Sequence, residues 1–493
     1  SNNNVVENST ARNNLGGIFL WDSDNNLISS IVSENNPVFE GFASAGIILA
    51  RSSNNTLTNN ACDNNFFGIY DSSSSNNTLD NNTCNHNFRG IHLDDSNNET
   101  LINNILSNNR YNFGVWGSSI SHFVHDIDTS NLVDGKPIRY LVGCSGEVVD
   151  SSLEVGYLGL VNCDNIRVEN LALENNIEGI LLAFTDNSHV DNCTLGNNET
   201  GVFLNNSDNN VIKNCTVSGN IDEGIYLLDD SDNNALTNNT CENNELYGIA
   251  IWDSDNNIIS GNTLKNNWTG IYLGPSSNNQ IYHNNLINNN NQVYDDGTNK
   301  WDGGYPSGGN YWSNYTGVDE NHGENQDIPG SDGIGDTPYY IPGGSNLDRY
   351  PLMRPWAVKS KAEIRTVIYP AADVYAFSGD GTRYSRTQLK FDISNVPSGS
   401  KILSAKLWLY RFAADNWDGE VLLNRVDDQL WGEKITAIEF DAQTLTNEET
   451  QASKFMSPGW DYLDVEDQLN VDHGAGHAYS SYRLRWANDD GSE

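Results

Sequence analysis

Positive charge is scarce in this sequence. Among 493 residues, 26 are Lys or Arg and 66 are Asp or Glu, which gives a formal net charge of −40. Because binding to nucleic acid requires Lys and Arg to neutralise phosphates, we expect no nucleic-acid partner. An anionic membrane surface is disfavoured for the same reason. A charge of this sign favours solubility, cation binding or a salty environment.

Long apolar runs are also missing. No stretch approaches the run of about 20 apolar residues that a membrane-spanning helix needs. The hydrophobic fraction of 37% is low for a compact globule but normal for a slender solenoid with a narrow core. The chain begins inside a repeat-like sequence with no signal peptide before it, so we expect the mature part of an exported protein. Dense Asn-x-Ser/Thr acceptor sites suit an extracellular or cell-surface location.

Cysteine is too sparse and too scattered for a disulfide framework. The chain has seven cysteines. Cys62, Cys84 and Cys241 occupy the position that Leu or Val fills in other repeats, so we expect them to be buried core thiols. Cys193 and Cys215 lie one repeat apart and could form a disulfide.

What the sequence has in abundance is one repeat. Residues 248–267 read GIAIWDSDNNIISGNTLKNN, and similar segments recur with their first glycines, such as Gly46, Gly68 and Gly90, at steps of 22 to 24 residues. Alternation with period two and a fixed step of this length predict the coils of a parallel β-helix. Successive coils, here called rungs, would stack about 4.8 Å apart. The paired Asn at each corner suit this fold, because Asn tolerates a left-handed backbone and can bond to the Asn of the next rung.

The sequence therefore predicts an all-β chain with three regions. We expect a parallel β-helix over residues 1–295, with a lateral β-hairpin inserted at about residues 121–160. A Gly-, Trp- and Tyr-rich segment over residues 296–356 would cap the open end of the solenoid. Residues 357–493 change to ordinary alternating strands and predict a smaller antiparallel β-sandwich.

Several segments resemble known families. The coils resemble the right-handed parallel β-helix repeats of carbohydrate-binding and sugar-hydrolysing proteins. The motif GNYWSNYTG and the later DGIGDTPYYIPGGSNLDRYPLM resemble the tail of archaeal surface proteins built on such repeats. The stretch TVIYPAADVYAFSGDGTRYSRTQLKFDIS resembles the disaggregatase-related module of methanogenic archaea.

These resemblances cover nearly the whole chain and imply a disaggregatase. Such an enzyme would degrade a chondroitin-like, uronate-containing polysaccharide outside the cell by hydrolysis. A uronate lyase on the same scaffold and a non-catalytic surface adhesin are the alternatives, because the fold alone carries little functional weight. The partner implied is an acidic polysaccharide, and the outer faces of the β-helix could also pair copies of the chain.

Aromatic side chains are expected along one outer face of the solenoid. Ile and Leu after each repeat glycine should point inward, which leaves the residues between them outside. One outward column is predicted to contain Phe19, Ile48, Tyr70, His92, Trp116, Leu181, Phe203, Tyr226, Ala250 and Tyr272. Such a stripe would suit sugar stacking, and burial under loops, the hairpin or a neighbouring subunit is the alternative.

The strongest candidate site lies in the third to fifth rungs. We expect Asp71, His92, Asp94 and Asp95 to be catalytic. Carboxylates on adjacent rungs would lie about 5–5.5 Å apart, as in retaining glycosidases, and carboxylates two rungs apart would fall near the inverting range. Asp71 stands where other rungs place Leu or Ile, and burial would raise its pKa as a general acid requires. The substrate-binding candidates are Tyr70, Arg89, Arg110, Tyr111 and Trp116.

The same cluster has two other interpretations. In a lyase, His92 or Tyr70 would abstract the proton beside the uronate carboxylate, which an Arg or a Ca²⁺ held by Asp94 and Asp95 would neutralise. Alternatively, the acids and arginines only neutralise each other on a solvated face.

Further acids precede the glycines of later rungs. Glu178, Glu199, Asp222, Glu223 and Glu245 are expected to be exposed turn acids, with a cation site or a second carboxylate pair as the alternatives. No cofactor is required by the proposed chemistry. In the cap, Asp332 and Asp336 resemble a calcium loop and could hold a structural Ca²⁺.

Overall fold

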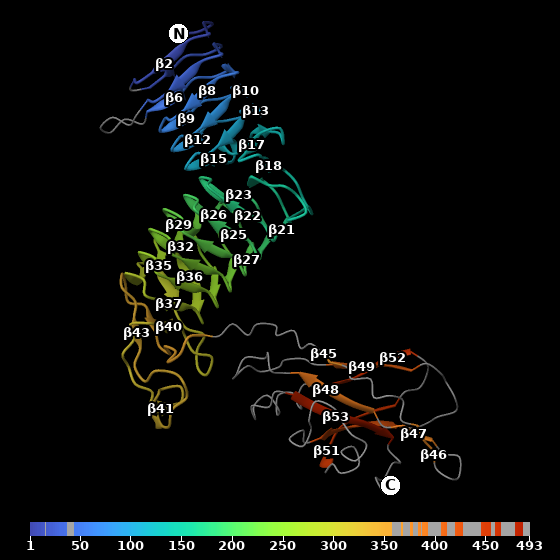
Figure 1. The fold of residues 1–493 in the computed structure, drawn as a ribbon. Helices are drawn as coiled ribbons and strands as arrows, with labels where there is room; N and C mark the ends of the chain where they lie inside the picture. Colours follow the sequence, from blue (N-terminus) through green and yellow to red (C-terminus); the bar gives the residue numbers. More distant parts are fainter. Residues whose placement is uncertain are drawn as a thin grey trace. The chain divides into compact units, whose positions relative to one another are not determined.

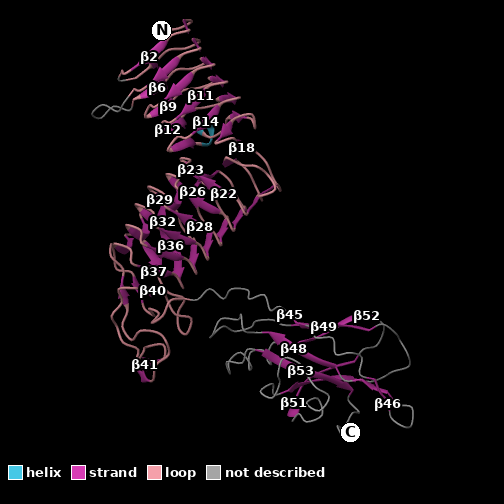
Figure 2. Cartoon of the chain, viewed as in Figure 1, coloured by secondary structure: helices cyan, strands magenta, loops and turns pink. Residues whose placement is uncertain are grey.

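The computed structural model describes residues 1–14, 16–36 and 44–356 in full, and beyond residue 356 only the backbone of the strands. Contacts divide the chain into two units, Ser1–Ala357 and Val358–Glu493. The first unit is a parallel β-helix with a bend near its middle, which Figures 1 and 2 show. The predicted all-β fold with a parallel solenoid is confirmed.

The first half of the solenoid has three walls. Its longest strands form what we call the first long sheet: β3 (Ile18–Trp21), β6 (Ala45–Ala50), β9 (Phe67–Ser72), β12 (Arg89–Asp94) and β15 (Tyr111–Trp116). The second wall contains β1 (Val5–Glu7), β4 (Leu27–Ser29), β7 (Thr56–Thr58), β10 (Thr78–Asp80), β13 (Thr100–Ile102) and β16 (Asp126–Ile127). The third wall begins with β2 (Thr10–Arg12), β5 (Val32–Glu34), β8 (Ala61–Asp63), β11 (Thr83–Asn85), β14 (Ile105–Ser107) and β17 (Leu132–Val133).

The third wall continues into the second half, where it becomes the second long sheet. This sheet contains β18 (Lys136–Val142), β20 (Tyr157–Val161), β23 (Glu178–Ala183), β26 (Thr200–Asn205), β29 (Glu223–Leu228), β32 (Tyr247–Trp252), β35 (Thr269–Leu273) and β38 (Asn291–Asp295). The next wall contains β19 (Val148–Asp150), β21 (Arg167–Glu169), β24 (His189–Asp191), β27 (Val211–Lys213), β30 (Ala235–Thr237), β33 (Ile258–Ser260), β36 (Ser277–Tyr282) and β39 (Thr298–Lys300). The last contains β22 (Ala172–Glu174), β25 (Thr194–Gly196), β28 (Thr216–Ser218), β31 (Thr240–Glu242), β34 (Thr263–Lys265), β37 (Asn285–Ile287) and β40 (Tyr311–Trp312).

The segment between the two halves departs from the prediction. The hairpin expected to protrude at about residues 121–160 instead forms part of the wall. β17 and β18 pair antiparallel around Asp134 and Gly135, and β18 then pairs in parallel with β20. The reason is burial, since Val133 and Ile138 point into the core. A single 3-10 turn, Ile120–His122, is the one helical element of the described residues, none of which forms a helix fit to span a membrane.

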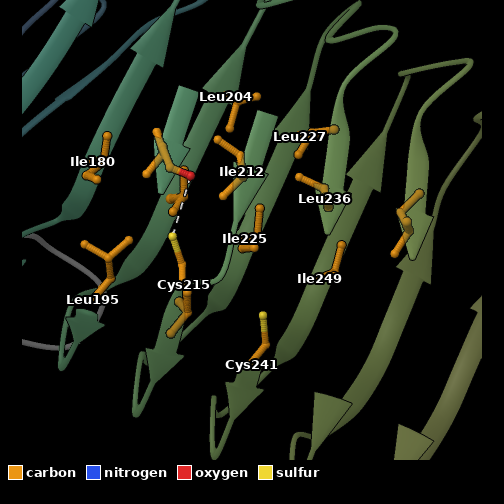
Figure 3. Packing of buried hydrophobic residues seen from close by; sticks show 14 of the residues in the cluster. Ile180, Leu195, Leu204, Ile212, Cys215, Ile225, Leu227, Leu236, Cys241 and Ile249 are labelled. Atoms are coloured by element: carbon orange, nitrogen blue, oxygen red, sulfur yellow. Dashed lines mark hydrogen bonds between the residues drawn. The ribbon is translucent and has the colours of Figure 1, made fainter. Parts of the chain in front are cut away.

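Ladders of apolar side chains fill the interior. Ile225 pairs with Ile249 on the next rung, and Cys241 pairs with Val217 on one side and Leu264 on the other. Figure 3 shows Ile225, Ile249 and Cys241 inside the solenoid. The predicted core position of Cys62, Cys84 and Cys241 is therefore confirmed, and all seven cysteines are free thiols, Cys193 and Cys215 included.

Asparagine ladders hold the corners. At most pairs the first Asn has a left-handed backbone, as at Asn81 with φ of 54°. The second Asn is buried there, and its amide bonds to both neighbouring rungs: Asn82 Nδ2 donates to Asn104 Oδ1 at 3.0 Å and to Leu57 O at 2.9 Å. These bonds satisfy polar groups that the turns would otherwise bury unpaired. The predicted role of the paired Asn is confirmed.

The glycine that opens each long strand is required by the stacking. A Cβ on Gly248 would lie 2.6 Å from Gly270 O and 2.8 Å from Asn267 Nδ2, so the next rung leaves no room for a side chain. The recurrence of glycine at this position is therefore a packing requirement.

The cap covers the last rungs with two buried tryptophans. Trp301 Nε1 donates to Asp295 at 2.6 Å, and Trp312 Nε1 donates to Asp348 at 2.8 Å. Two small antiparallel pairs complete it: β41 (Asn321–His322) with β42 (Ile328–Pro329), and β43 (Tyr339–Tyr340) with β44 (Leu347–Asp348).

The described strands of the second unit pair antiparallel. A five-stranded sheet has the order β45 (Thr366–Val367), β48 (Thr387–Asp392), β53 (Tyr479–Trp486), β50 (Glu420–Val426) and β51 (Leu445–Lys454). Two further pairs join β46 (Tyr375–Phe377) to β47 (Arg383–Ser385) and β49 (Lys406–Arg411) to β52 (Gly459–Asp464).

Candidate functional site

A groove lies where the first long sheet ends and the second begins. β15 meets the start of β23 through Ile177 N, which donates to Phe113 O at 2.9 Å, and Asn112 N, which donates to Asn175 O at 2.6 Å. Next to this junction is a cavity of about 230 Å³. We call it the junction groove; it is lined by Trp116, Ile177, Glu178, Glu199, Thr200, Phe203, Asp222, Glu223 and Tyr226.

One side of the junction groove is aromatic. The rings of Trp116 and Phe203 stack with centroids 4.9 Å apart and planes 3° apart, and Phe203 stacks on Tyr226 at 5.4 Å. Trp116 is 38% exposed whereas Phe203 is 1% exposed. Trp116 therefore presents an open face over a buried ring, an arrangement suited to the apolar face of a sugar.

Glu178 is the most deeply buried acid of the groove. Its side chain is 2% exposed, and its Oε2 accepts hydrogen bonds from Tyr157 Oη at 2.9 Å and Val115 N at 3.2 Å. Burial raises the pKa of Glu178 to about 8. The carboxyl is therefore neutral at pH 7, and its Oε1 has no partner among the described residues.

Three more carboxyls lie on two adjacent rungs. Asp222 N donates to Glu199 O at 3.0 Å, which places these residues one above the other, and Thr200 Oγ1 donates to Glu223 Oε2 at 2.9 Å. Burial, with repulsion from Asp222, raises the pKa of Glu223 to about 7, and burial with repulsion from Glu199 raises the pKa of Asp222. Glu223 is only half-buried, so a ligand in the groove could reach it.

A guanidinium from the first long sheet joins these acids. Arg89 forms an ion pair with Glu199, a residue 110 positions later in the chain, and its Nε donates to Glu199 Oε2 at 2.9 Å. Arg110, one rung further, is exposed, and its guanidinium lies 5.3 Å from the Phe88 ring centre. In residues 1–14, 16–36 and 44–356, no carboxylate forms an ion pair with Arg110. Tyr111, predicted to bind substrate, is buried.

Asp71 occupies the interior of the solenoid. It is 0% exposed, between Leu49 and Leu93 of the neighbouring rungs, and accepts hydrogen bonds from Asn77 and Ser96. Burial raises its pKa, as expected for Asp in a leucine position. Because no solvent reaches it, the predicted catalytic role of Asp71 is corrected: the carboxyl cannot touch a polymer on the surface.

The other catalytic candidates lie together on the first long sheet, outside the lining of the junction groove. Tyr70 Oη donates a hydrogen bond to Asp94, and burial with this bond raises the pKa of Tyr70 to about 12. Burial raises the pKa of Asp94 as well. Asp95 turns away to His122, whose Nδ1 lies 2.9 Å from Asp95 Oδ1.

His92 lies under the rings of Phe67 and Tyr70, at 6.0 and 5.6 Å between centroids. Burial lowers the pKa of His92 to about 3, and neither ring nitrogen has a partner among the described residues. The side chain is therefore neutral at pH 7, and both ring nitrogens are buried although the residue as a whole is partly exposed.

The outward column is correct except at the junction. Phe19, Ile48, Tyr70 and His92 pair in sequence, but His92 then pairs with Gly114, and Trp116 pairs with Asp94. The prediction placed Trp116 two residues out of register because Asn112, and not Gly114, stands at the repeat-glycine position of that rung. In the second half, Phe203, Tyr226, Ala250 and Tyr272 pair in register, but Leu181, Phe203 and Ala250 are buried.

The acids before the later glycines are more buried than the sequence predicted. Glu178 and Glu223 were expected to be exposed turn acids, but the first is buried and the second half-buried in the junction groove. The crowding of these acids in the sequence was a signal that they form a site. The sequence did not indicate the junction between the two long sheets, which brings Trp116 and Arg89 close to them.

The calcium prediction lies in the cap. Asp332 Oδ1 accepts from Ile334 N at 3.0 Å, and Asp336 accepts from Glu320 N and Asn321 N, both at 3.1 Å. Among the described residues, no group of three or more His, Cys, Asp or Glu side chains is arranged to hold a metal ion. The calcium site stays a prediction.

Comparisons with known proteins support the fold. The family model described as periplasmic copper-binding protein (NosD) matches residues 1–139 and 145–317. No curated protein matches the chain. Solved structures that resemble it include the periplasmic alginate epimerase AlgG in a double-mutant form, with 14% identity, a TM-score of 0.26 and coverage of 60% of this chain and 69% of that chain.

Two further structures resemble the chain to a similar degree. The A-module of the Azotobacter vinelandii mannuronan C-5 epimerase AlgE4 has 12% identity and a TM-score of 0.25, over 61% of this chain and 88% of that chain. The DFA-IIIase of Arthrobacter chlorophenolicus A6 has 10% identity and a TM-score of 0.23, over 54% of this chain and 63% of that chain. At these values the likeness is one of fold alone.

Proposed function

The chain belongs to the NosD family. We propose that it is a polysaccharide hydrolase that acts outside the cytoplasm through the junction groove. The observation that carries the proposal is that four carboxyls lie beside an aromatic face in the junction groove. Glu223 is the proposed general acid, and Glu199 the proposed nucleophile.

The proposed acid has the protonation that this role needs. A general acid works best when its pKa lies near the working pH, and burial holds the pKa of Glu223 at about 7. Glu223 also lines the cavity and is only half-buried. It can therefore reach a glycosidic oxygen and donate a proton to it as the bond breaks.

The proposed nucleophile lies one rung from the proposed acid. Thr200 pairs with Glu223 and Glu199 with Asp222, so Glu199 is diagonal to Glu223 across two rungs that stack about 4.8 Å apart. Retaining glycosidases place their two carboxyls about 5–5.5 Å apart. Glu199 would attack the anomeric carbon, and Glu223, now deprotonated, would activate the water that releases the product. The ion pair with Arg89 orients Glu199 for this attack.

The substrate class is proposed to be an acidic polysaccharide with uronate units. Arg110 is exposed, lies over the ring of the buried Tyr111 and has no ion-pair partner among the described residues, so its guanidinium is free to bind a carboxylate at two points. A protein of charge −40 needs such local positive charge to hold a polyanion. The chondroitin-like polymer implied by the disaggregatase resemblance is one member of this class.

The lyase alternative finds less support. Its proposed bases were His92 and Tyr70, but burial lowers the pKa of His92 to about 3 and raises that of Tyr70 to about 12. Both would be poor proton acceptors at neutral pH.

The copper in the family's description does not fit the described residues. Cys193 and Cys215 lie inside the solenoid, and no group of three or more His, Cys, Asp or Glu side chains is arranged around a common point in residues 1–14, 16–36 and 44–356. We therefore derive no step through copper.

The proposal is tested by digesting a glucuronate–hexosamine polysaccharide, with new reducing ends and absorbance at about 232 nm measured together. Hydrolysis is expected to release reducing ends without absorbance. Rising absorbance would replace hydrolysis with β-elimination. If neither signal appears with several uronate polymers while the protein binds them, the surface adhesin becomes the better account.

A further inference from the structure

A second group of aromatic rings lies on the second long sheet beyond the junction groove. Tyr272 is its centre: Tyr294 stacks on it at 5.3 Å with planes 11° apart, Trp252 at 5.9 Å with planes 14° apart, and Tyr247 leans on it at 4.8 Å. We call these four residues the aromatic platform. Trp252 is 41% and Tyr294 37% exposed, so the platform is open to solvent.

The platform is in line with the groove. Tyr226 of the groove pairs with Ala250, Ala250 with Tyr272, and Tyr272 with Tyr294, so all four stand in one column along the solenoid. Tyr272 is two rungs from Tyr226, which is about 10 Å at about 4.8 Å per rung. An extended sugar polymer lying along the column would thus pass from the groove onto the platform.

The backbone makes room for the largest ring. A Cβ on Gly274 would lie 2.9 Å from the Trp252 indole, so the indole rests against the backbone of the next rung. Ala250, between Tyr226 and Tyr272 in the column, has only a methyl side chain. Because Gly274 and Ala250 are small, the Trp252 indole lies flat beside Tyr272. The surface therefore presents the faces and edges of the rings.

We propose that the aromatic platform is a remote subsite that binds the same polysaccharide chain by stacking on its pyranose rings. The inference rests on the proposed function for the identity of the polymer, although it needs no cleavage. The carboxylates of Asp296 and Glu223 act electrostatically on Tyr272 and Tyr247, so the platform would hold the uncharged sugars of the polymer and leave the uronates to Arg110.

The test measures polymer affinity in the full chain, with Glu223→Gln present throughout so that no substrate is consumed. Trp252→Ala with Tyr272→Ala is expected to weaken binding of the long polymer about tenfold or more, because each lost stack costs about 0.5–1.5 kcal/mol and 1.4 kcal/mol is about tenfold. Binding of a disaccharide, which fills only the groove, should not change. Trp252→Phe with Tyr272→Phe should restore polymer affinity. Tyr282→Ala, a ring of β36 on another wall, is the matched control.

The outcomes separate the two proposals. Polymer affinity equal to that of the unsubstituted platform would overturn the platform, even if the wild-type chain cleaves the polymer. Weakened binding together with no cleavage by the wild-type chain would leave the platform standing and remove the hydrolase. If the substitutions instead dissolve a dimer without changing polymer affinity, the platform is an interface between copies of the chain, and the proposal fails.

Discussion

Two acids share the interior of the solenoid, and their titration should be visible in stability. Asp71 and Glu99 are both 0% exposed. Asp71 replaces a leucine of the core ladder, and Glu99 replaces an asparagine of the corner ladder, where its carboxyl accepts from Asn77 N at 2.7 Å. Burial raises both pKa values, and repulsion between the two acids raises that of Glu99 further.

The sign of the effect follows from the direction of these shifts. The folded protein keeps protons that the unfolded chain releases above its ordinary pKa values of 3.8 for Asp and 4.5 for Glu. The stabilisation is therefore complete below about pH 4 and is lost as the pH rises towards the folded pKa values. Each such group lowers the free energy of unfolding by about 1.4 kcal/mol per pH unit across that window.

Asp71→Asn removes one of the two groups and keeps its shape. Asn77 and Ser96 retain other acceptors, Ser52 O at 2.9 Å and Asp94 O at 3.2 Å, so little hydrogen bonding is lost. We expect the free energy of unfolding to fall with pH less steeply in the variant, by about 1.4 kcal/mol per pH unit above about pH 5.

Urea unfolding at a series of pH values, followed by circular dichroism, measures this slope. Asp126→Asn, on an exposed strand of the same half, is the matched control. Equal slopes for the wild type and Asp71→Asn would refute the claim that the buried carboxyl holds its proton in the folded state.

Three further predictions concern the scaffold and the groove. Asn82→Ala should lower the free energy of unfolding by about 3 kcal/mol, because Asn60 N, Asn60 Nδ2 and Leu57 O lose a buried partner. Asn81→Gly, at the exposed left-handed position beside it, should lower it far less. Similar losses in the two variants would contradict the stabilising role of the asparagine ladder. Gly248→Ala should destabilise by about 1–3 kcal/mol in the same assay, and Gly196→Ala, whose Cβ would meet nothing closer than 3.1 Å, should be milder. Trp116→Ala should raise KM about tenfold with little change in melting temperature, since its ring is 38% exposed, and an unchanged KM would remove the ring from the binding site.

Much of the scaffold could be predicted from the sequence because its determinants are local. The glycine, the inward Ile and Leu and the paired Asn each act within a rung or between neighbouring rungs. Cys241 shows this well: its repeat position alone placed it between Val217 and Leu264. A hairpin was predicted between the two halves, but its place in the wall depends on the burial of Ile138 and its pairing with Tyr157.

The candidate site could be predicted only in part because it forms where the repeat is broken. Arg89 and Trp116 were predicted to bind substrate beside catalytic acids that are close to them in sequence, such as Asp94 and Asp95. The structure joins Arg89 to Glu199 instead, across 110 residues. The period of the repeat does not indicate which rungs meet where the two long sheets join. Conversely, Asp71 looked reactive because it broke the pattern, and the same break explains its burial.

The most direct test of the proposed hydrolase is the turnover of Glu223→Gln on a uronate polysaccharide, compared with that of Asp94→Asn. Loss of a general acid lowers kcat about 10²–10⁴-fold, so Glu223→Gln should lose activity by this factor while retaining polymer binding. Asp94→Asn, bonded to Tyr70 away from the groove lining, should keep near wild-type turnover. The reverse pattern, full activity in Glu223→Gln and none in Asp94→Asn, would contradict the assignment of the active site to the junction groove.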